Sequence, residues 1–203
     1  MTTILKINSS LYSEAGQSSQ LATQFIDALR ERDADTSVIV RDVAREPVPH
    51  LDAARFGAFL AKPEERTPDQ RQATAYSDRL IAELKAADVI VLGLPLYNFG
   101  LPSTLKAYFD HIARAGVTFK YTEKGAVGLL TGKKAYVFAT RGGYYAGKPS
   151  DTQSAYVRDF LAFLGITDVE FVYAEGLAIG EAVKTASLAK AREALRQLVP
   201  AYA

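Results

Sequence analysis

The residues from Val89 to Phe99 read V-I-V-L-G-L-P-L-Y-N-F, and this stretch decides the fold class. Its first half is a run of β-branched and other apolar residues, which is typical of a strand buried on both faces of a sheet. The run leads directly into Pro95-Leu96-Tyr97-Asn98-Phe99, which offers an aromatic ring, a carboxamide and free backbone amides. Ligands bind beyond the carboxyl ends of the strands in an open parallel sheet. We therefore expect a ligand site at this loop.

Similar apolar runs recur along the chain, with helical segments between them. They span Ile4 to Ile7, Ser37 to Val40, Ala135 to Ala139 and Val169 to Tyr173. Strands that alternate with helices are typical of a parallel α/β sheet. The apolar stripes that would cover this sheet include Leu21, Phe25, Ile26 and Leu29, then Tyr76, Leu80, Ile81 and Leu84, and a last helix at about Glu181 to Leu198. We expect a doubly wound sheet with helices on both faces.

Two helix starts and two insertions are marked in the sequence. Thr67-Pro68-Asp69-Gln70 predicts a capping box with proline at the first helical position, and Ser150-Asp151-Thr152-Gln153 repeats the pattern with Ser150 as the N-cap. The insertions span residues 42–66 and 114–134, and segments this long are usually functional or lie at an interface. Turn residues from Thr122 to Gly125 predict a short hairpin in the second insertion.

Composition limits the alternatives. The 203 residues, 48% of them hydrophobic, favour one domain over residues 1–203. A net charge of +1 gives no field that would attract nucleic acid or an anionic membrane. Because the chain has no cysteine and only His50 and His111, we expect no metal site, and chemistry must come from a cofactor, carboxylates or hydroxyls. Without a signal-peptide pattern or an apolar run of ~20 residues, we expect a cytoplasmic protein that does not cross a membrane.

The loop after the first predicted strand, from Asn8 to Ser19, is rich in hydroxyls and leads into a helix. Hydroxyls and free amides at a helix N-terminus can bind a phosphate without any lysine or arginine. The alternative is that Ser18 or Ser19 serves only as an N-cap. The loop has no G-x-G-x-x-G, so a standard dinucleotide-binding fold is not expected.

The loop after the fourth predicted strand contains Thr140-Arg141-Gly142-Gly143. Adjacent glycines let the backbone approach a ligand and point amides at it, as the pyrimidine edge of a flavin would require, although they could also form only a turn. Residues 142–148 also match G-x-x-x-x-G-K of a nucleotide-binding P-loop. We discount that match because Pro149 supplies no hydroxyl for magnesium and the loop does not follow the first strand.

The remaining histidine and aromatic residues carry weaker signals. We interpret His50 and His111 as surface or satisfied core residues. Phe160 and Phe163 stand three apart on a predicted helix, which favours the core, whereas Phe119 and Tyr121 alternate with polar neighbours, which favours a cleft.

Taken together, these segments resemble the FMN-dependent NADH:quinone oxidoreductases, also called azoreductases. The resemblance covers almost the whole chain, and its motifs are Ser9-Ser10, Gly16-Gln17-Ser18, Pro95 to Phe99, Ala115-Gly116-Val117-Thr118-Phe119, Tyr121-Thr122-Glu123 and Arg141-Gly142-Gly143. It implies a flavodoxin-like five-stranded parallel sheet with strand order 2-1-3-4-5. It also implies a homodimer with two FMN sites at the interface.

The resemblance assigns roles residue by residue. The expected cofactor-binding residues are Ser10, Gly16, Gln17 and Ser18 at the phosphate, Pro95, Leu96, Tyr97, Asn98 and Phe99 at the isoalloxazine, and Thr140, Arg141, Gly142 and Gly143 on its other side. The expected substrate pocket is formed by Phe99, Phe119, Tyr121 and Phe163. Many relatives have Met where Leu96 stands and Ser where Thr140 stands, and we expect both departures to tune binding without abolishing it.

The implied reaction is a two-electron ping-pong transfer from NADH or NADPH, through tightly bound FMN, to a quinone or an aromatic azo compound. The cofactor carries the hard chemistry, and no side chain is an obvious acid or base, so we expect substrate protons to come from water. A flavodoxin-type electron carrier without NADH turnover is the alternative. Near-zero charge argues against it because carriers dock through charged faces. A P-loop hydrolase that uses Lys148 ranks third.

Overall fold

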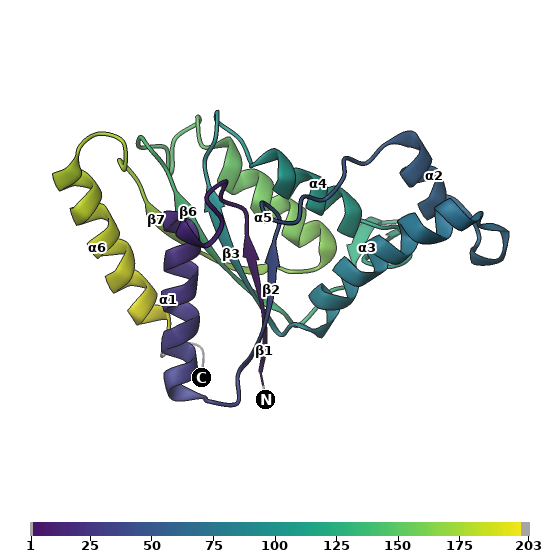
Figure 1. The fold of residues 1–203 in the computed structure, drawn as a ribbon, viewed down its shortest axis with the longest axis horizontal. Coiled ribbons are helices and arrows are strands. Elements are labelled where there is room, and N and C mark those ends of the chain that lie inside the picture. Colours follow the sequence, from purple (N-terminus) through teal and green to yellow (C-terminus); the bar gives the residue numbers. More distant parts are fainter. Residues whose placement is uncertain (1, 200–203) are drawn as a thin grey trace.

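The computed structural model describes residues 2–199, and five parallel strands form its central sheet (Figure 1). In spatial order the strands are β2 (Ser37–Asp42), β1 (Thr3–Asn8), β3 (Val89–Pro95), β6 (Lys134–Thr140) and β7 (Asp168–Ala174). Counted along the chain within this sheet, the order is 2-1-3-4-5, so the predicted flavodoxin-like topology is confirmed. Each predicted strand is present, and every residue of β3 is buried, as its continuous apolar run predicts.

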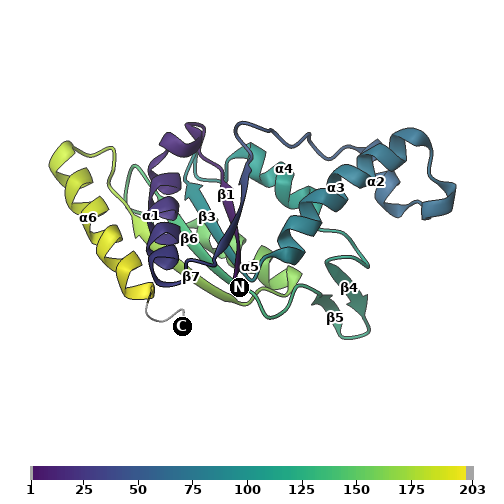
Figure 2. The ribbon, with the colours of Figure 1, turned by 60° about the horizontal axis from the view of Figure 1, so that its bottom comes forward.

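Helices cover both faces of this sheet (Figures 1 and 2). One face carries α1 (Gln17–Arg32) and α6 (Glu181–Leu198), and the other carries α3 (Pro68–Ala86), α4 (Ser103–Ile112) and α5 (Thr152–Leu164). The predicted stripe of α1 is buried in full, whereas Tyr76 of the α3 stripe is only half-buried. Two apolar cores, one on each side of the sheet, hold the layers together.

The strand order places a topological switch point between β1 and β3. From β1 the chain moves outward to β2, and it then returns to the other side of β1 as β3. The loops that follow β1 and β3 therefore diverge at the carboxyl edge, which leaves room for a ligand between them. This edge also carries the loops that follow β6 and β7.

The structure confirms one predicted helix cap and corrects the other. Thr67 and Gln70 form the predicted capping box at the start of α3. At α5 the N-cap is Asp151 and not Ser150, because the Asp151 carboxylate accepts a hydrogen bond from the Ser154 N–H at 3.0 Å. Gln153, expected to complete a capping box, instead turns into the protein interior.

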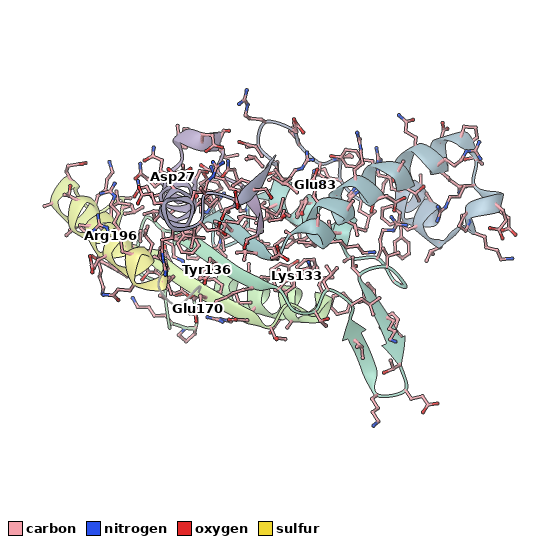
Figure 3. All side chains as sticks on the ribbon, turned by 90° about the horizontal axis from the view of Figure 1, so that it is seen from below. Asp27, Glu83, Lys133, Tyr136, Glu170 and Arg196 are labelled. Carbon is pink, nitrogen blue, oxygen red and sulfur yellow. The ribbon has the colours of Figure 1, made fainter. Side chains whose placement is uncertain are left out.

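Both insertions contain regular structure. Residues 42–66 hold α2 (Ala53–Leu60) and a short 3-10 helix, Pro63–Glu65. Residues 114–134 hold the predicted hairpin, formed by β4 (Phe119–Thr122) and β5 (Gly125–Gly128), which projects from the body of the molecule (Figures 2 and 3). A Cβ atom on Gly128 would lie 2.0 Å from the Gly165 nitrogen, so the hairpin base packs directly on the end of α5. Within residues 2–199 no helix is long and apolar enough to cross a membrane.

Candidate cofactor site

The loop after β1 ends at the unprotected N-terminus of α1. Gly16 is the N-cap and has no side chain to cap the helix, so the expectation that Ser18 or Ser19 caps α1 is not met. The N–H groups of the first helical turn have no partner within the helix. Ser18 and Ser19 are fully buried, and their hydroxyls have no hydrogen-bond partner among residues 2–199. A buried hydroxyl without a partner is costly, so this turn is built to receive a polar group.

Close packing shapes this loop into a cradle. A Cβ atom on Gly16 would lie 2.1 Å from the Ser10 hydroxyl oxygen, so any larger residue would push into the cradle. Glu14 ties the loop to β1, because its carboxylate accepts hydrogen bonds from the Lys6 ammonium at 2.6 Å and from the Asn8 amide at 2.7 Å. The Ser13 hydroxyl, on a residue with a φ of 51°, donates to Asp42. The cradle is therefore held in shape before any ligand binds.

The loop after β3 contains a strained turn. Asn98 and Phe99 have φ values of 48° and 63°, as the central residues of a type I′ turn do. Tyr97 and Gly100 close the turn by exchanging backbone hydrogen bonds of 3.3 and 2.9 Å. Asn tolerates this left-handed conformation, whereas for a bulky residue such as Phe99 it costs on the order of 1–2 kcal/mol. Strain of this kind collects at ligand sites, where the fold over-determines the conformation.

Tyr97 joins the loops after β1 and β3. Its hydroxyl lies 3.4 Å from the Ser10 hydroxyl and accepts a hydrogen bond from the Leu11 N–H at 3.3 Å. Ser9 adds a second connection, since its hydroxyl donates to the Gly93 carbonyl at 2.7 Å. The cradle and the strained turn are thus parts of one site.

Arg141, in the loop after β6, lies beneath that loop. Its side chain is fully buried and forms ion pairs with Asp151 at 2.8 Å and with Glu175 at 3.2 Å. Its backbone N–H and carbonyl are also paired, with Ala174 and Leu177. Burial by itself would raise the pKa of the Asp151 carboxyl, but hydrogen bonds from Arg141 and Ser154 outweigh burial and lower it. Arg141 therefore supports the loop from below and does not present its guanidinium to the site.

The two glycines that follow Arg141 leave backbone donors free. Gly142 and Gly143 use their carbonyls to accept from Ala178 and Gly176, while their own N–H groups have no acceptor within residues 2–199. Glu175 accepts the next two N–H groups of the loop, from Tyr145 at 2.7 Å and Ala146 at 2.8 Å. Free amides in a loop whose Tyr145 ring meets the exposed Phe99 ring suit a flat ligand with polar edges.

These observations test whether the residues fit FMN, and they do. The unpartnered Ser18 and Ser19 hydroxyls and the Gly16 cradle fit a phosphate. The strained turn and the free amides of Gly142 and Gly143 fit a planar ring. Of the other expected contacts, Leu96 lies in the loop after β3, whereas Gln17, Pro95 and Thr140 are the end residues of α1, β3 and β6 that border these loops.

One chain does not bring the four expected pocket residues together. Phe119 packs on Phe163, with ring centroids 4.2 Å apart, and Tyr121 packs on Phe119 at 5.4 Å. Phe99 instead meets Tyr145 at 5.7 Å. Phe99 lies beside the first residues of α5 and Phe163 near its last, so the two groups are separated by roughly 16 Å along the helix. Phe160 is partly buried and stacks on the core residue Phe109, in agreement with the predicted packing against the core.

The weaker candidates have structural roles. His111 is buried and its Nε2 lies 3.0 Å from the Pro49 carbonyl oxygen, while His50 is exposed. The Lys148 ammonium donates to the carbonyl of Tyr144 in its own loop at 2.9 Å. Pro149 follows Lys148 at the position where a P-loop has serine or threonine. Among the described residues no group of three His, Asp or Glu side chains is arranged to hold a metal.

Residues that the sequence signals did not assign to the site complete it. Thr152 and Gln153 hold the strained turn, and Glu14 and Glu175 hold the two flanking loops. Gln153 carried a signal, since its position three residues after Ser150 marked it as special, but the signal pointed to a local cap. Its true partners are more than fifty residues away in the chain.

A doubly wound sheet whose switch point carries a polar cradle and flanking loops is typical of the flavodoxin-like class of proteins. Residues 2–199 match the family model described as a flavodoxin-like fold. The chain belongs to this family, in the group that includes the FMN-dependent NADH:quinone oxidoreductases.

Similar proteins include both curated sequences and solved structures. The FMN-dependent NADH:quinone oxidoreductase of Cellvibrio japonicus is 55% identical over 99% of this chain and 100% of its own length. FMN-dependent NADH:quinone oxidoreductase 6 of Burkholderia lata is 53% identical over 96% and 98%. The FMN complex of an FMN-dependent NADH-azoreductase from Bacillus anthracis has a TM-score of 0.86 at 28% identity, with 98% of this chain and 100% of that chain covered.

Proposed function

We propose that this protein is an FMN-dependent NAD(P)H oxidoreductase that reduces quinones and cleaves aromatic azo compounds. The observation that carries the proposal is the set of unpartnered polar groups around the switch point, above all the buried hydroxyls of Ser18 and Ser19. The names of the relatives above agree with this assignment.

The chain would hold FMN tightly through backbone and hydroxyl donors. Ser10, the first turn of α1 and the Gly16 cradle would bind the phosphate. Asn98 and the amides of Gly142 and Gly143 would donate to the polar edge of the ring. When bound, FMN supplies the two-electron chemistry between NADH or NADPH and the acceptor.

We propose a ping-pong order, in which the nicotinamide and the acceptor use one ring face in turn. The protein would contribute orientation and a flat apolar slot that excludes water. Because no side chain at the site is an evident acid or base, water would supply the protons that the acceptor takes up.

A homodimer would complete the acceptor slot. The group formed by Phe119, Tyr121 and Phe163 lies far from Phe99 in its own chain, yet Tyr121 is 74% exposed on a projecting hairpin. A second copy related by a twofold axis could place this group over the ring site of its partner. The proposed active sites therefore lie at the interface between two chains.

An anaerobic absorbance titration tests the function. We expect the FMN-loaded protein to bleach when NADH or NADPH is added and to recover its colour when a quinone follows. A bound flavin that neither nicotinamide reduces would support the electron-carrier alternative. No bound flavin at all would contradict the proposal.

A further inference from the structure

The first turn of α5 holds the strained turn after β3. Gln153 is 1% exposed, and its amide nitrogen donates to the carbonyls of Pro95 at 2.9 Å and Gly100 at 3.2 Å. The Thr152 hydroxyl donates to the Phe99 carbonyl at 2.6 Å. Two neighbouring side chains thus bind the end of β3, the last residue of the turn and the turn's strained centre.

The residue before them holds the loop after β6. Asp151 accepts hydrogen bonds from both terminal nitrogens of Arg141, at 2.8 and 3.0 Å, and Arg141 carries Gly142 and Gly143 directly after it. The Ser154 hydroxyl adds a contact to the same guanidinium at 2.8 Å. Consecutive residues of one helix therefore reach two loops that come from different strands.

Such a helix turn can fix the distance between the two loops. A turn with two non-glycine residues at positive φ is held in place by its surroundings, since neither residue prefers that conformation. Loss of the buried Gln153 donor and of the exposed Thr152 donor would also leave three backbone carbonyls with fewer partners. Without these contacts we expect the turn to relax away from Gly142 and Gly143.

We propose that Asp151, Thr152 and Gln153 form a positioning element that holds both ring-facing loops of the flavin site in register. The inference rests on the proposed function, because it assigns the two loops to the isoalloxazine. The element touches no phosphate-binding residue, so it governs affinity for the ring and not for the phosphate. It also governs the reduction potential, because misplaced amides would stabilise the more negative reduced ring less.

The test compares Thr152→Val and Gln153→Met, which keep the approximate shape of each side chain and remove its donor. Dissociation constants for FMN and for riboflavin, which lacks the phosphate, are measured by quenching of flavin fluorescence. We expect both constants to rise about tenfold and by the same factor. We also expect the midpoint potential to become more negative, because the variants should lose more affinity for reduced flavin than for oxidised flavin. Each tenfold difference between these two losses of affinity corresponds to about 30 mV.

Two controls separate positioning from loss of stability. Thr152→Ser keeps the hydroxyl and should bind both flavins as the unaltered protein does. Val157→Ala removes buried apolar volume one turn further along α5 and has no side-chain donor to lose, so it should lower the unfolding midpoint without changing the potential. Thr152 is exposed, so Thr152→Val is expected to fold even if Gln153→Met does not.

The outcomes are distinct. If Thr152→Val binds both flavins with dissociation constants within twofold of those of the unaltered protein, and its midpoint potential is unchanged, the inference is overturned while the proposed function stands. An equal shift in Val157→Ala would also overturn it, because the effect would then follow stability alone. Failure of the unaltered protein to bind either flavin would instead remove the proposed function itself.

Discussion

Arg141 and Asp151 form a two-pronged ion pair in which both terminal nitrogens of the guanidinium meet the carboxylate, at distances of 2.8 and 3.0 Å. The guanidinium carbon also lies 4.9 Å from the centre of the Tyr173 ring on β7. This pair joins the loop after β6 to the start of α5, and Glu175 extends it to the segment after β7. The buried Arg141 guanidinium therefore holds together the loop after β6, the start of α5 and the segment after β7.

Removing that cation should be costly. Arg141→Met leaves Asp151 and Glu175 buried or half-buried without their partner, and we expect a loss of about 3–5 kcal/mol in the free energy of unfolding. Urea unfolding of the apoprotein measures it. Arg196→Met is the matched control, and Arg196 is labelled on α6 in Figure 3. Because the ion pair of Arg196 with Glu193 is exposed, this variant should lose less than about 1 kcal/mol. Equal losses in the two variants would contradict the role of Arg141.

His111 should make the protein less stable in mild acid. Burial lowers the pKa of its imidazole below the ordinary value of 6.5, although the Pro49 carbonyl opposes this, and its Nδ1 is buried without a partner among the described residues. The unfolded chain then binds the proton more readily than the folded chain does, so stability falls as the pH drops through about 6.5.

His111→Gln tests this pH dependence, because glutamine can still donate to the Pro49 carbonyl but does not titrate. We expect the fall in unfolding midpoint between pH 8 and pH 5 to be smaller in the variant than in the unaltered protein. Parallel curves for the two proteins would show that His111 does not contribute.

The cradle after β1 should select for the phosphate. Ser18→Ala removes a buried hydroxyl donor, and Gly16→Ala places a methyl group where Ser10 now lies. We expect each variant to bind FMN about tenfold more weakly, which corresponds to roughly 1.4 kcal/mol, as lost charged hydrogen bonds do. Riboflavin affinity should change less than twofold. A matching loss for both flavins would place these residues away from the phosphate.

The sheet was predictable because its strands are continuous apolar runs, which leave few alternatives for their place in the fold. The start of α5 was not, since Ser150 and Asp151 are both good N-caps, and the ion pair with the distant Arg141 that favours Asp151 leaves no local signal. The hydrogen-bond partners of Gln153 are likewise distant from it in the sequence. The turn residues from Thr122 to Gly125 correctly predicted the hairpin that carries Phe119 and Tyr121. No local pattern can say which end of α5 an aromatic residue faces, or whether its partner belongs to the same chain.

The proposed acceptor slot shared between two chains can be tested by mixing two defective chains. Gly16→Asp puts a negative side chain into the phosphate cradle and should abolish FMN binding, whereas Tyr121→Ser should keep FMN and reduce kcat/KM for quinones about tenfold. If the aromatic group of one chain serves the flavin of the other, a mixed dimer has one intact site, built from the flavin loops of the Tyr121→Ser chain and the hairpin of the Gly16→Asp chain. Random exchange of subunits should then restore about a quarter of the original activity. Mixtures that show only the sum of the separate activities would mean that each chain completes its own site, and the roughly 16 Å between Phe99 and Phe163 would then have to close by movement within one chain.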